Sequence, residues 1–159
     1  TIKTDEIGGK LHDRLMYLGA YLVLETVDLI KVGEIQATKQ PELEEKSAYK
    51  LYPHNCRIDW SNNLSDIYNH IRGLNPYPAA WTTIINNKEE ITAKIYNVSK
   101  EFENHNLETG TLIASKNELK IAVKEGYLII NEIKLSGKKR MDSKSLLNGF
   151  HFSEDAKAL

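Results

Sequence analysis

The chain has 159 residues, of which 41% are hydrophobic and 27% are charged, and its formal net charge is −1. This size and composition allow one globular domain with a sizeable core, or one small domain plus an appendage. No apolar run approaches the roughly 20 residues that span a bilayer, and no secretory signal is recognisable, so we expect a cytoplasmic protein without a membrane partner. A single cysteine excludes an internal disulfide and suits a reducing compartment.

The small net charge hides an uneven distribution along the chain. Residues 111–152 carry eight basic and four acidic side chains, a balance of +4. Residues 1–50 carry seven basic and nine acidic side chains, and residues 51–110 carry five and seven, so each of these blocks has a balance of −2. The charge of the whole chain therefore argues against nucleic-acid binding, whereas the local charge permits it on the C-terminal third.

The beginning of the chain has the apolar periodicity of a helix, with leucines recurring every three or four positions. Thr4 is the expected N-cap, and Gly33 is the expected C-terminal stop. Gly8-Gly9 predict a frayed start, and Gly19 predicts a break between two helices.

The apolar stripe of this segment has no nearby strand to pack against. We therefore expect residues 1–33 to be trailing helices of a larger α/β domain that lies upstream. The chain begins at Thr1 in what has the pattern of mid-domain sequence, so we expect it to be a fragment. Periodicity then vanishes, and residues 34–56 are predicted to be a linker with an exposed acidic stretch after Pro41.

A second helix is predicted from Ser61, its expected N-cap, to about Gly73. It should end at Asn75-Pro76 and Tyr77-Pro78, because proline offers no donor and forces the residue before it to be extended. Its buried stripe should consist of four apolar residues, Leu64, Ile67, Ile71 and Leu74.

Beyond Pro78 the apolar period becomes two, which is typical of strands. Residues 81–85 and 91–96 flank Asn86-Asn87-Lys88, a predicted hairpin turn. Three further strands are predicted at residues 111–114, 119–123 and 127–130, and a short helix capped by Ser143 should run through Leu147. Five or more short strands with tight turns favour a small antiparallel, OB-like β-barrel over residues 57–159, and the fold class is therefore α+β.

The sequence shows none of the usual catalytic or metal-binding constellations. The five histidines are scattered, and the cluster His54-Asn55-Cys56 lacks a second pair of ligands to complete a metal site. Cys56 has no basic helix end near it, and no serine occupies a nucleophile elbow. We therefore expect no catalytic residue, no metal and no cofactor in this chain.

The run Arg57-Ile58-Asp59-Trp60 is interpreted as structural in preference to a direct ligand-binding role. Trp60 can bury up to about 200 Å² and clamp the linker onto the barrel. Arg57 and Asp59 alternate to one face, where they can pair or bond to nearby backbone.

The proline-rich entry to the first strand is also interpreted as structural. Asn75, Pro76 and Pro78 are expected to provide turn chemistry and not binding groups. Trp81 alternates with Thr82, so Trp81 is expected to face the core.

The run Lys138-Lys139-Arg140 is the densest basic cluster and follows Gly137 in a loop. A charge run is usually only a solvated face, but phosphate contacts need nothing more than mobile cations gathered on one surface. Small barrels with cationic loops are common nucleic-acid platforms. The candidate RNA-binding residues are Lys138, Lys139, Arg140, Lys116, Lys120, Lys144 and Lys50.

Several motifs together resemble the methionyl-tRNA formyltransferase family. Arg57-Ile58-Asp59-Trp60, followed by Arg72 and then Asn75 to Thr82, resembles the start of the family's C-terminal domain. The segment from Leu135 to Met141, leading to Leu146–Phe150, resembles the C-terminal signature of that domain.

The resemblance implies an intact enzyme that transfers a formyl group from 10-formyltetrahydrofolate to the amino group of methionyl initiator tRNA. Its catalytic residues would lie upstream of Thr1, and this chain would contribute tRNA binding and not chemistry. We expect a monomer whose leading helices can associate in crystals. The alternative is an accessory or oligomerisation domain of a sugar-nucleotide or folate formyltransferase, with no role in nucleic-acid binding.

The chain departs from the family pattern at two places. The family commonly has Pro-Gly-Ala where this chain has Pro78-Ala79-Ala80, which puts a positive φ at residue 79 in question. Relatives tend to carry lysines and acids before the first motif, whereas here the segment from Tyr52 to Cys56 replaces them and Lys50 remains.

Overall fold

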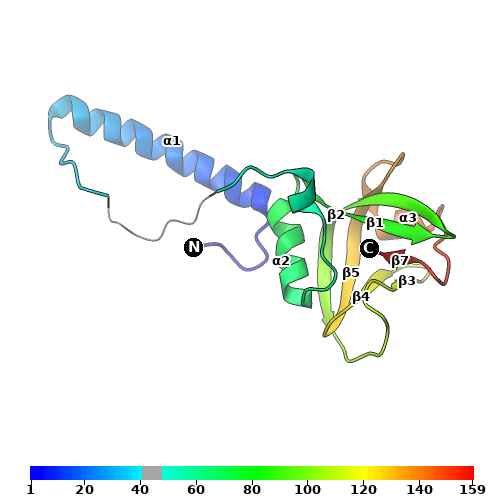
Figure 1. Cartoon of the computed structure of the whole chain (residues 1–159). Helices are drawn as coiled ribbons and strands as arrows, with labels where there is room; N and C mark the ends of the chain where they lie inside the picture. The colour runs from blue at the N-terminus through cyan, green and yellow to red at the C-terminus, as the bar shows by residue number, and fades with distance from the viewer. Residues whose placement is uncertain (41–47) are drawn as a thin grey trace.

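A computed structural model describes residues 1–40 and 48–159 (Figure 1). The helical elements in these residues are α1 (Gly8–Val32), the 3₁₀ turn η1 (Pro53–Cys56), α2 (Leu64–Leu74) and α3 (Ser143–Leu147). The strands are β1 (Ala80–Asn86), β2 (Glu89–Phe102), β3 (Leu112–Ala114), β4 (Leu119–Val123), β5 (Gly126–Leu135), β6 (Met141–Asp142) and β7 (Lys157–Ala158).

The strands form one curled antiparallel sheet with the order β3-β4-β5-β2-β1-β7, and β6 pairs with β5. The two ends of this order meet, because Thr111 forms an antiparallel bridge with Lys157 and the Leu112 amide donates to the Ala156 carbonyl at 3.0 Å. The sheet is therefore a nearly closed barrel with a few helices, as Figure 1 shows, which confirms the predicted α+β fold.

The core lies inside the barrel and beneath α2. Residues of β1 alternate between buried and half-buried, as expected for a strand with one face toward a core. The predicted stripe of α2 is confirmed, because its four apolar residues are all buried against the barrel: Leu64, Ile67, Ile71 and Leu74. Helix and sheet thus share one continuous hydrophobic cluster.

The N-cap of α2 differs from the prediction. Asn63, and not Ser61, caps the helix, since the Asn63 side-chain oxygen accepts a bond from the Asp66 amide at 2.9 Å. The Ser61 amide and hydroxyl instead donate to Asp59 Oδ1 at 2.9 and 2.7 Å. Ser61 is part of the turn that precedes the helix, so the N-cap lies two residues later than predicted.

Helix α1 is continuous, so the predicted break at Gly19 is wrong. A single glycine in a helix costs only about 1 kcal/mol, which the flanking helix formers can absorb. The N-cap position is Ile7, which contributes no side-chain bond, and not Thr4. The C-terminal stop at Gly33 is confirmed, with a left-handed φ of 74°.

The predicted fraying at Gly8-Gly9 is also wrong, because these glycines dock α1 onto the end of α2. A Cβ atom at Gly8 would stand 2.2 Å from the Gly73 carbonyl oxygen. The Gly9 amide donates to the Asn75 carbonyl at 2.8 Å. The absence of side chains therefore permits a close backbone approach.

The rest of α1 projects away from the barrel (Figure 1) and buries no residue. Its apolar side chains are largely exposed, among them Leu15, Leu18, Leu22, Val23 and Ile30. Among residues 1–40 and 48–159, no helix is both long and apolar enough to cross a bilayer.

Strands β2 and β5 are longer than predicted, at 14 and 10 residues. The sequence pattern stops early because polar residues such as Asn131 and Glu132 follow the apolar run of β5. In the structure Glu132 pairs with Asn97 on β2 and with Asp142 on β6. Asn131 lies at a register shift, and its side-chain amide donates to the Ser99 hydroxyl at 2.8 Å. The hairpin turn is confirmed at Asn87 and Lys88, whose φ values of 52° and 68° suit a tight turn between twisted strands.

The segment between α2 and β1 contains cis bonds at both Asn75-Pro76 and Tyr77-Pro78. Ala79 has a φ of 71° and is almost fully buried. The left-handed conformation is therefore kept although the residue is alanine and not glycine.

The predicted linker, residues 34–56, contains η1 near its end. Its predicted exposed acidic stretch, residues 41–47, lies outside the described residues.

Candidate nucleic-acid interface

Trp60 joins the segment after η1 to the barrel. Its side chain is only 5% exposed, and its Nε1–H donates to the Thr82 hydroxyl at 2.9 Å. That hydroxyl in turn donates to the Leu159 carbonyl at 2.8 Å. The Ile58 amide adds a backbone bond to the Trp81 carbonyl at 2.8 Å. The segment is thus held to β1 by both burial and hydrogen bonds.

Trp81 does not face the core, so the prediction from the sequence is wrong. Thr82 points inward with 0% exposure, so Trp81 lies half-buried on the outer face of β1. There its Nε1–H donates to the Pro53 carbonyl at 2.7 Å, and the Arg57 guanidinium lies 5.6 Å from its ring centre. The interior position goes to Thr82 because its hydroxyl partners the buried Trp60 indole.

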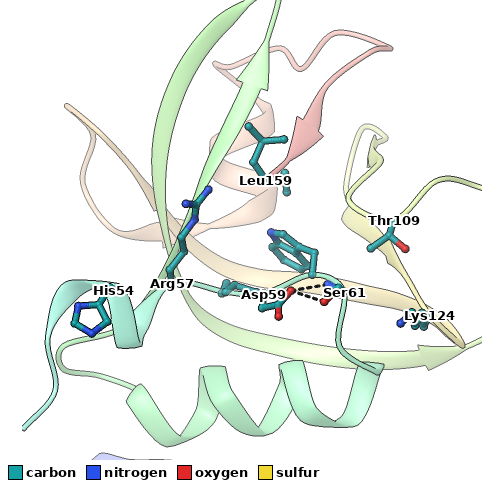
Figure 2. A pocket seen from close by; sticks show the side chains of 10 residues that line it. His54, Arg57, Asp59, Ser61, Thr109, Lys124 and Leu159 are labelled. Carbon is teal, nitrogen blue, oxygen red and sulfur yellow. Dashed lines mark hydrogen bonds between the residues drawn. The ribbon is translucent and has the colours of Figure 1, made fainter.

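A hollow of about 620 Å³ lies beside Trp60 and contains Asp59 (Figure 2). Figure 2 shows Arg57 and Lys124 on opposite sides of the Asp59 carboxylate, which is directed at Ser61. The Ser61 hydroxyl and amide hold the pKa of Asp59 below its usual value, with a smaller contribution from the charge of Lys124. Asp59 therefore stays charged near neutral pH and serves the turn before α2.

The environment of Asp59 does not tune it for general acid–base catalysis. A general acid or base works best with a pKa near the operating pH, and the pKa of Asp59 moves in the opposite direction. Among the residues that the structure describes, no group of three or more His, Cys, Asp or Glu side chains could hold a metal ion.

The predicted basic cluster lies in the loop between β5 and β6, and its members differ. Lys139 is exposed, and the Lys138 ammonium lies 5.5 Å above the Phe150 ring. Arg140 makes two hydrogen bonds to Glu132, at 2.6 and 2.5 Å, and stacks 4.0 Å from the Tyr96 ring centre. These bonds raise the pKa of Arg140, and its charge is locally neutralised.

Lys120 resembles Arg140 in having acidic partners. Its ammonium lies 2.7 Å from a Glu101 oxygen and 3.3 Å from a Glu118 oxygen, which raises the Lys120 pKa. A lysine held between two glutamates has little net charge to offer a phosphate. Lys120 is therefore a weaker candidate for RNA contact than a lysine without an acidic partner.

The other candidates lie on three separate segments. Lys116 is in the turn between β3 and β4, Lys144 is on α3, and Lys50 lies 5.3 Å from the Tyr52 ring in the segment before η1. Leu119 pairs with Ile130 on β5, and the Ser143 hydroxyl donates to the Ile130 carbonyl at 2.5 Å. The segments that carry Lys116 and Lys144 therefore contact the same part of β5, whereas Lys50 belongs to the segment before η1.

Sequence reasoning missed a row of residues on the outer face of three neighbouring strands. Trp81 on β1 pairs with Lys94 on β2, and Lys94 pairs with Lys134 on β5. The alternation of β2 could have placed Lys94 on this face. The row itself required the strand register, which no local pattern supplies.

A small antiparallel barrel with a cationic and aromatic outer face is the class of structure that these observations define. Residues 50–151 match the model of the formyl transferase C-terminal domain. This match covers more than half of the chain, and the chain belongs to that family.

Curated relatives share this similarity over nearly the whole chain. It is 45% identical over 157 residues to the methionyl-tRNA formyltransferase of Flavobacterium johnsoniae, which covers 98% of this chain and 50% of the relative. It is 40% identical over 150 residues to the methionyl-tRNA formyltransferase of Bacteroides fragilis, covering 91% and 46%. The chain therefore spans about half the length of these relatives.

Solved structures with the same fold include HypX from Aquifex aeolicus. A HypX variant matches with a TM-score of 0.63 and 15% identity, over 92% of this chain and 27% of that chain. A HypX crystal structure in complex with tetrahydrofolic acid matches with a TM-score of 0.52 and 18% identity, over 79% and 22%. At these identities the likeness shows the fold alone.

Proposed function

We propose that this chain is the C-terminal part of a cytoplasmic methionyl-tRNA formyltransferase. The intact enzyme would transfer a formyl group from 10-formyltetrahydrofolate to the amino group of methionyl initiator tRNA, in translation initiation. The observation that carries this proposal is the 45% identity to an enzyme of that name over 98% of the chain. The part described here would supply tRNA binding, and the upstream part of the enzyme would supply the folate site and the chemistry.

The proposed division is residues 1–33 as trailing helices of the upstream domain, 34–56 as linker and 57–159 as the tRNA-binding barrel. The exposure of apolar residues along α1 supports it, because a helix with an unpartnered apolar stripe needs another surface to cover it. The barrel, in contrast, is covered by its own helix α2.

The proposed tRNA contacts are to phosphates, through cations that are not neutralised by neighbouring acids. Lys138 and Lys139 are the strongest candidates, since both are exposed and neither forms an ion pair with any described residue. Lys116, Lys144 and Lys50 would add to the charge from other segments. Lysine ammonium groups on a loop supply charge without the fixed geometry that reads base edges.

The proposal is tested with the chain itself. The chain should bind initiator tRNA with an affinity that falls steeply as salt rises, and should give only background formyl transfer with the folate donor and methionyl-tRNA. Failure to bind tRNA at low salt would favour the alternative, an accessory domain of a sugar-nucleotide or folate formyltransferase. Transfer activity that persists through further purification would contradict the division of labour.

A further inference from the structure

A second hollow, of about 560 Å³, lies on the outer face between η1 and strands β1 and β2. Its volume falls within the range of small-ligand pockets. The walls are largely apolar or aromatic, and they include Tyr52, Tyr77, Pro78 and Trp81. Among the described residues that line it, Lys94 is the one that carries a charge. An apolar pocket with a single cation is suited to a flat apolar group attached to an anion.

The two aromatic walls Trp81 and Tyr77 differ in how they are held: the Trp81 ring is fixed by contacts, whereas only the backbone of Tyr77 is restrained. The Trp81 ring is fixed by its bond to the Pro53 carbonyl at 2.7 Å and by the Arg57 guanidinium. Tyr77 lies between two prolines, which restrict its backbone, yet its side chain is 86% exposed. A large aromatic ring on a restrained segment with so little packing contributes little to the fold, and it is available for stacking.

The pocket continues into a cationic surface. Lys94 and Lys134 are register partners on the outer face, beside Trp81. Lys94 Nζ donates to the Pro78 carbonyl at 3.1 Å, which leaves two of its three N–H groups for a ligand. Neither lysine forms an ion pair with a described residue.

The loop that carries Lys138 and Lys139 begins at the same place. The Ser136 amide donates to the carbonyl of Thr92, a residue that lines the pocket. Glu132, the nearest acidic residue on β5, is neutralised by Arg140. The pocket therefore adjoins the loop that carries Lys138 and Lys139, while the acidic Glu90 lies further along the same outer face of β2.

We propose that this pocket binds one unpaired RNA base, stacked against Tyr77 and Trp81, while Lys94 and Lys134 contact the adjoining phosphates. The inference rests on the proposed function and adds to it the kind of RNA segment that is bound. Phosphate binding alone needs no aromatic pocket, whereas unstacked bases are held by aromatic faces beside a cationic track. A base within a helix is already stacked and is not available to the pocket. The occupant is therefore a single-stranded part of the RNA.

The test is a fluorescence anisotropy titration of the full chain with a labelled, unstructured RNA of about eight nucleotides. The same titration is made with an RNA duplex and with inorganic polyphosphate. The single strand should bind more tightly than a duplex of equal charge. Polyphosphate should compete poorly at low salt, since it offers charge without a base.

Tyr77→Leu keeps an apolar side chain but removes the ring, and it should weaken single-strand binding by about 5- to 100-fold. Lys94→Gln should lower the slope of log affinity against log salt by about 0.7, the value for one phosphate contact of a single strand. Phe102→Leu is the matched control, because Phe102 is also an exposed ring, 63% exposed, and lies at the far end of β2. It should leave binding unchanged.

Each outcome decides between the two proposals. If wild-type chain binds neither tRNA nor the oligonucleotide, the proposed function fails. If tRNA binding persists but Tyr77→Leu and Lys94→Gln both bind the single strand like wild type, the pocket assignment alone is overturned. A peptide-binding role for the pocket would give this second result. Should Tyr77→Leu lower thermal stability, Lys94→Gln decides by itself.

Discussion

Helix α1 and the barrel use apolar side chains in opposite ways. Among the residues described, the buried apolar side chains all lie between Cys56 and Ala158, whereas α1 buries none. Yet both regions have strong apolar periodicity in the sequence. Within the barrel, α2 and the strands cover one another's apolar faces, whereas no described residue buries the apolar side chains of α1. A periodic pattern therefore predicts that a helix or strand forms, but it does not predict whether the partner surface lies in the same domain.

The largest expected effect is on the barrel side of this comparison. Trp60→Ala should lower the free energy of unfolding by about 3–5 kcal/mol, because it removes a buried indole and leaves the Thr82 hydroxyl without that partner. Denaturant unfolding measures the change. Trp81→Ala is the control, since Trp81 is only half-buried, and it should cost less than half as much. A loss under about 1 kcal/mol for Trp60→Ala would mean that Trp60 does not clamp the segment to the barrel.

Removal of α1 tests whether the two regions are independent. A chain that starts at Ala48 should unfold cooperatively, with its free energy of unfolding lowered by about 1–2 kcal/mol because a few hydrogen bonds are removed. These bonds include Tyr68 hydroxyl to Asp5 at 2.6 Å and Arg72 to the Glu6 carbonyl at 2.9 Å. Thermal unfolding followed by near-UV circular dichroism measures the outcome. A molten or aggregated product would show that the barrel depends on α1.

Two glycines sharpen the comparison within α1 itself. Gly8→Ala places a methyl group against the Gly73 carbonyl, so it should weaken the docking of α1 by about 1 kcal/mol. Gly19→Ala is the matched control, because no atom of residues 1–40 or 48–159, apart from its chain neighbours and the surrounding helix backbone, lies within 4 Å of its Cβ position, and it should stabilise the helix by about 0.5–1 kcal/mol. Hydrogen exchange of the α1 amides measures both effects. Equal protection in the two variants would contradict docking through Gly8.

The smallest expected effect is the pH dependence of the turn at Asp59. Its pKa is lowered in the folded chain, so its contribution is present above the unfolded pKa of about 3.9 and is lost as pH falls through the folded pKa. The difference in melting temperature between wild type and Asp59→Ala should therefore be larger at pH 7 than at about pH 2. An equal difference at both pH values would mean that the charge of Asp59 does not stabilise the turn.

Local features of the fold were predictable from the sequence. The spacing of Leu64, Ile67, Ile71 and Leu74 predicted the face of α2, and Gly33 predicted the end of α1. These features depend on residues within a few positions of one another. The order of the motifs along the whole chain also predicted the family, because the motifs at residues 57–60, 75–82 and 135–141 occur in one chain.

Features set by contacts between distant residues were not predictable. The alternation of Trp81 and Thr82 does not say which of the two faces inward, and the hydroxyl of Thr82 decides it by bonding to Trp60, 22 residues away. The pairing of Arg140 with Glu132 depends on β5 continuing past its apolar run. Neither contact leaves a local signal, and both change which polar and charged groups remain without a partner in the described part of the chain.

The measurement that tests the central claim most directly is the salt dependence of tRNA binding. In Lys138→Ala/Lys139→Ala, tRNA affinity should fall, and the slope of log affinity against log salt should decrease by about one unit for each phosphate that the variant no longer binds. The control is Lys10→Ala/Lys31→Ala, which removes the same charge from α1 and should leave the slope unchanged. Initiator and elongator tRNA should respond alike, because the proposed interactions are with phosphate. Wild-type affinity and slope in the Lys138/Lys139 variant would contradict the assignment of the barrel loop as the tRNA-binding surface.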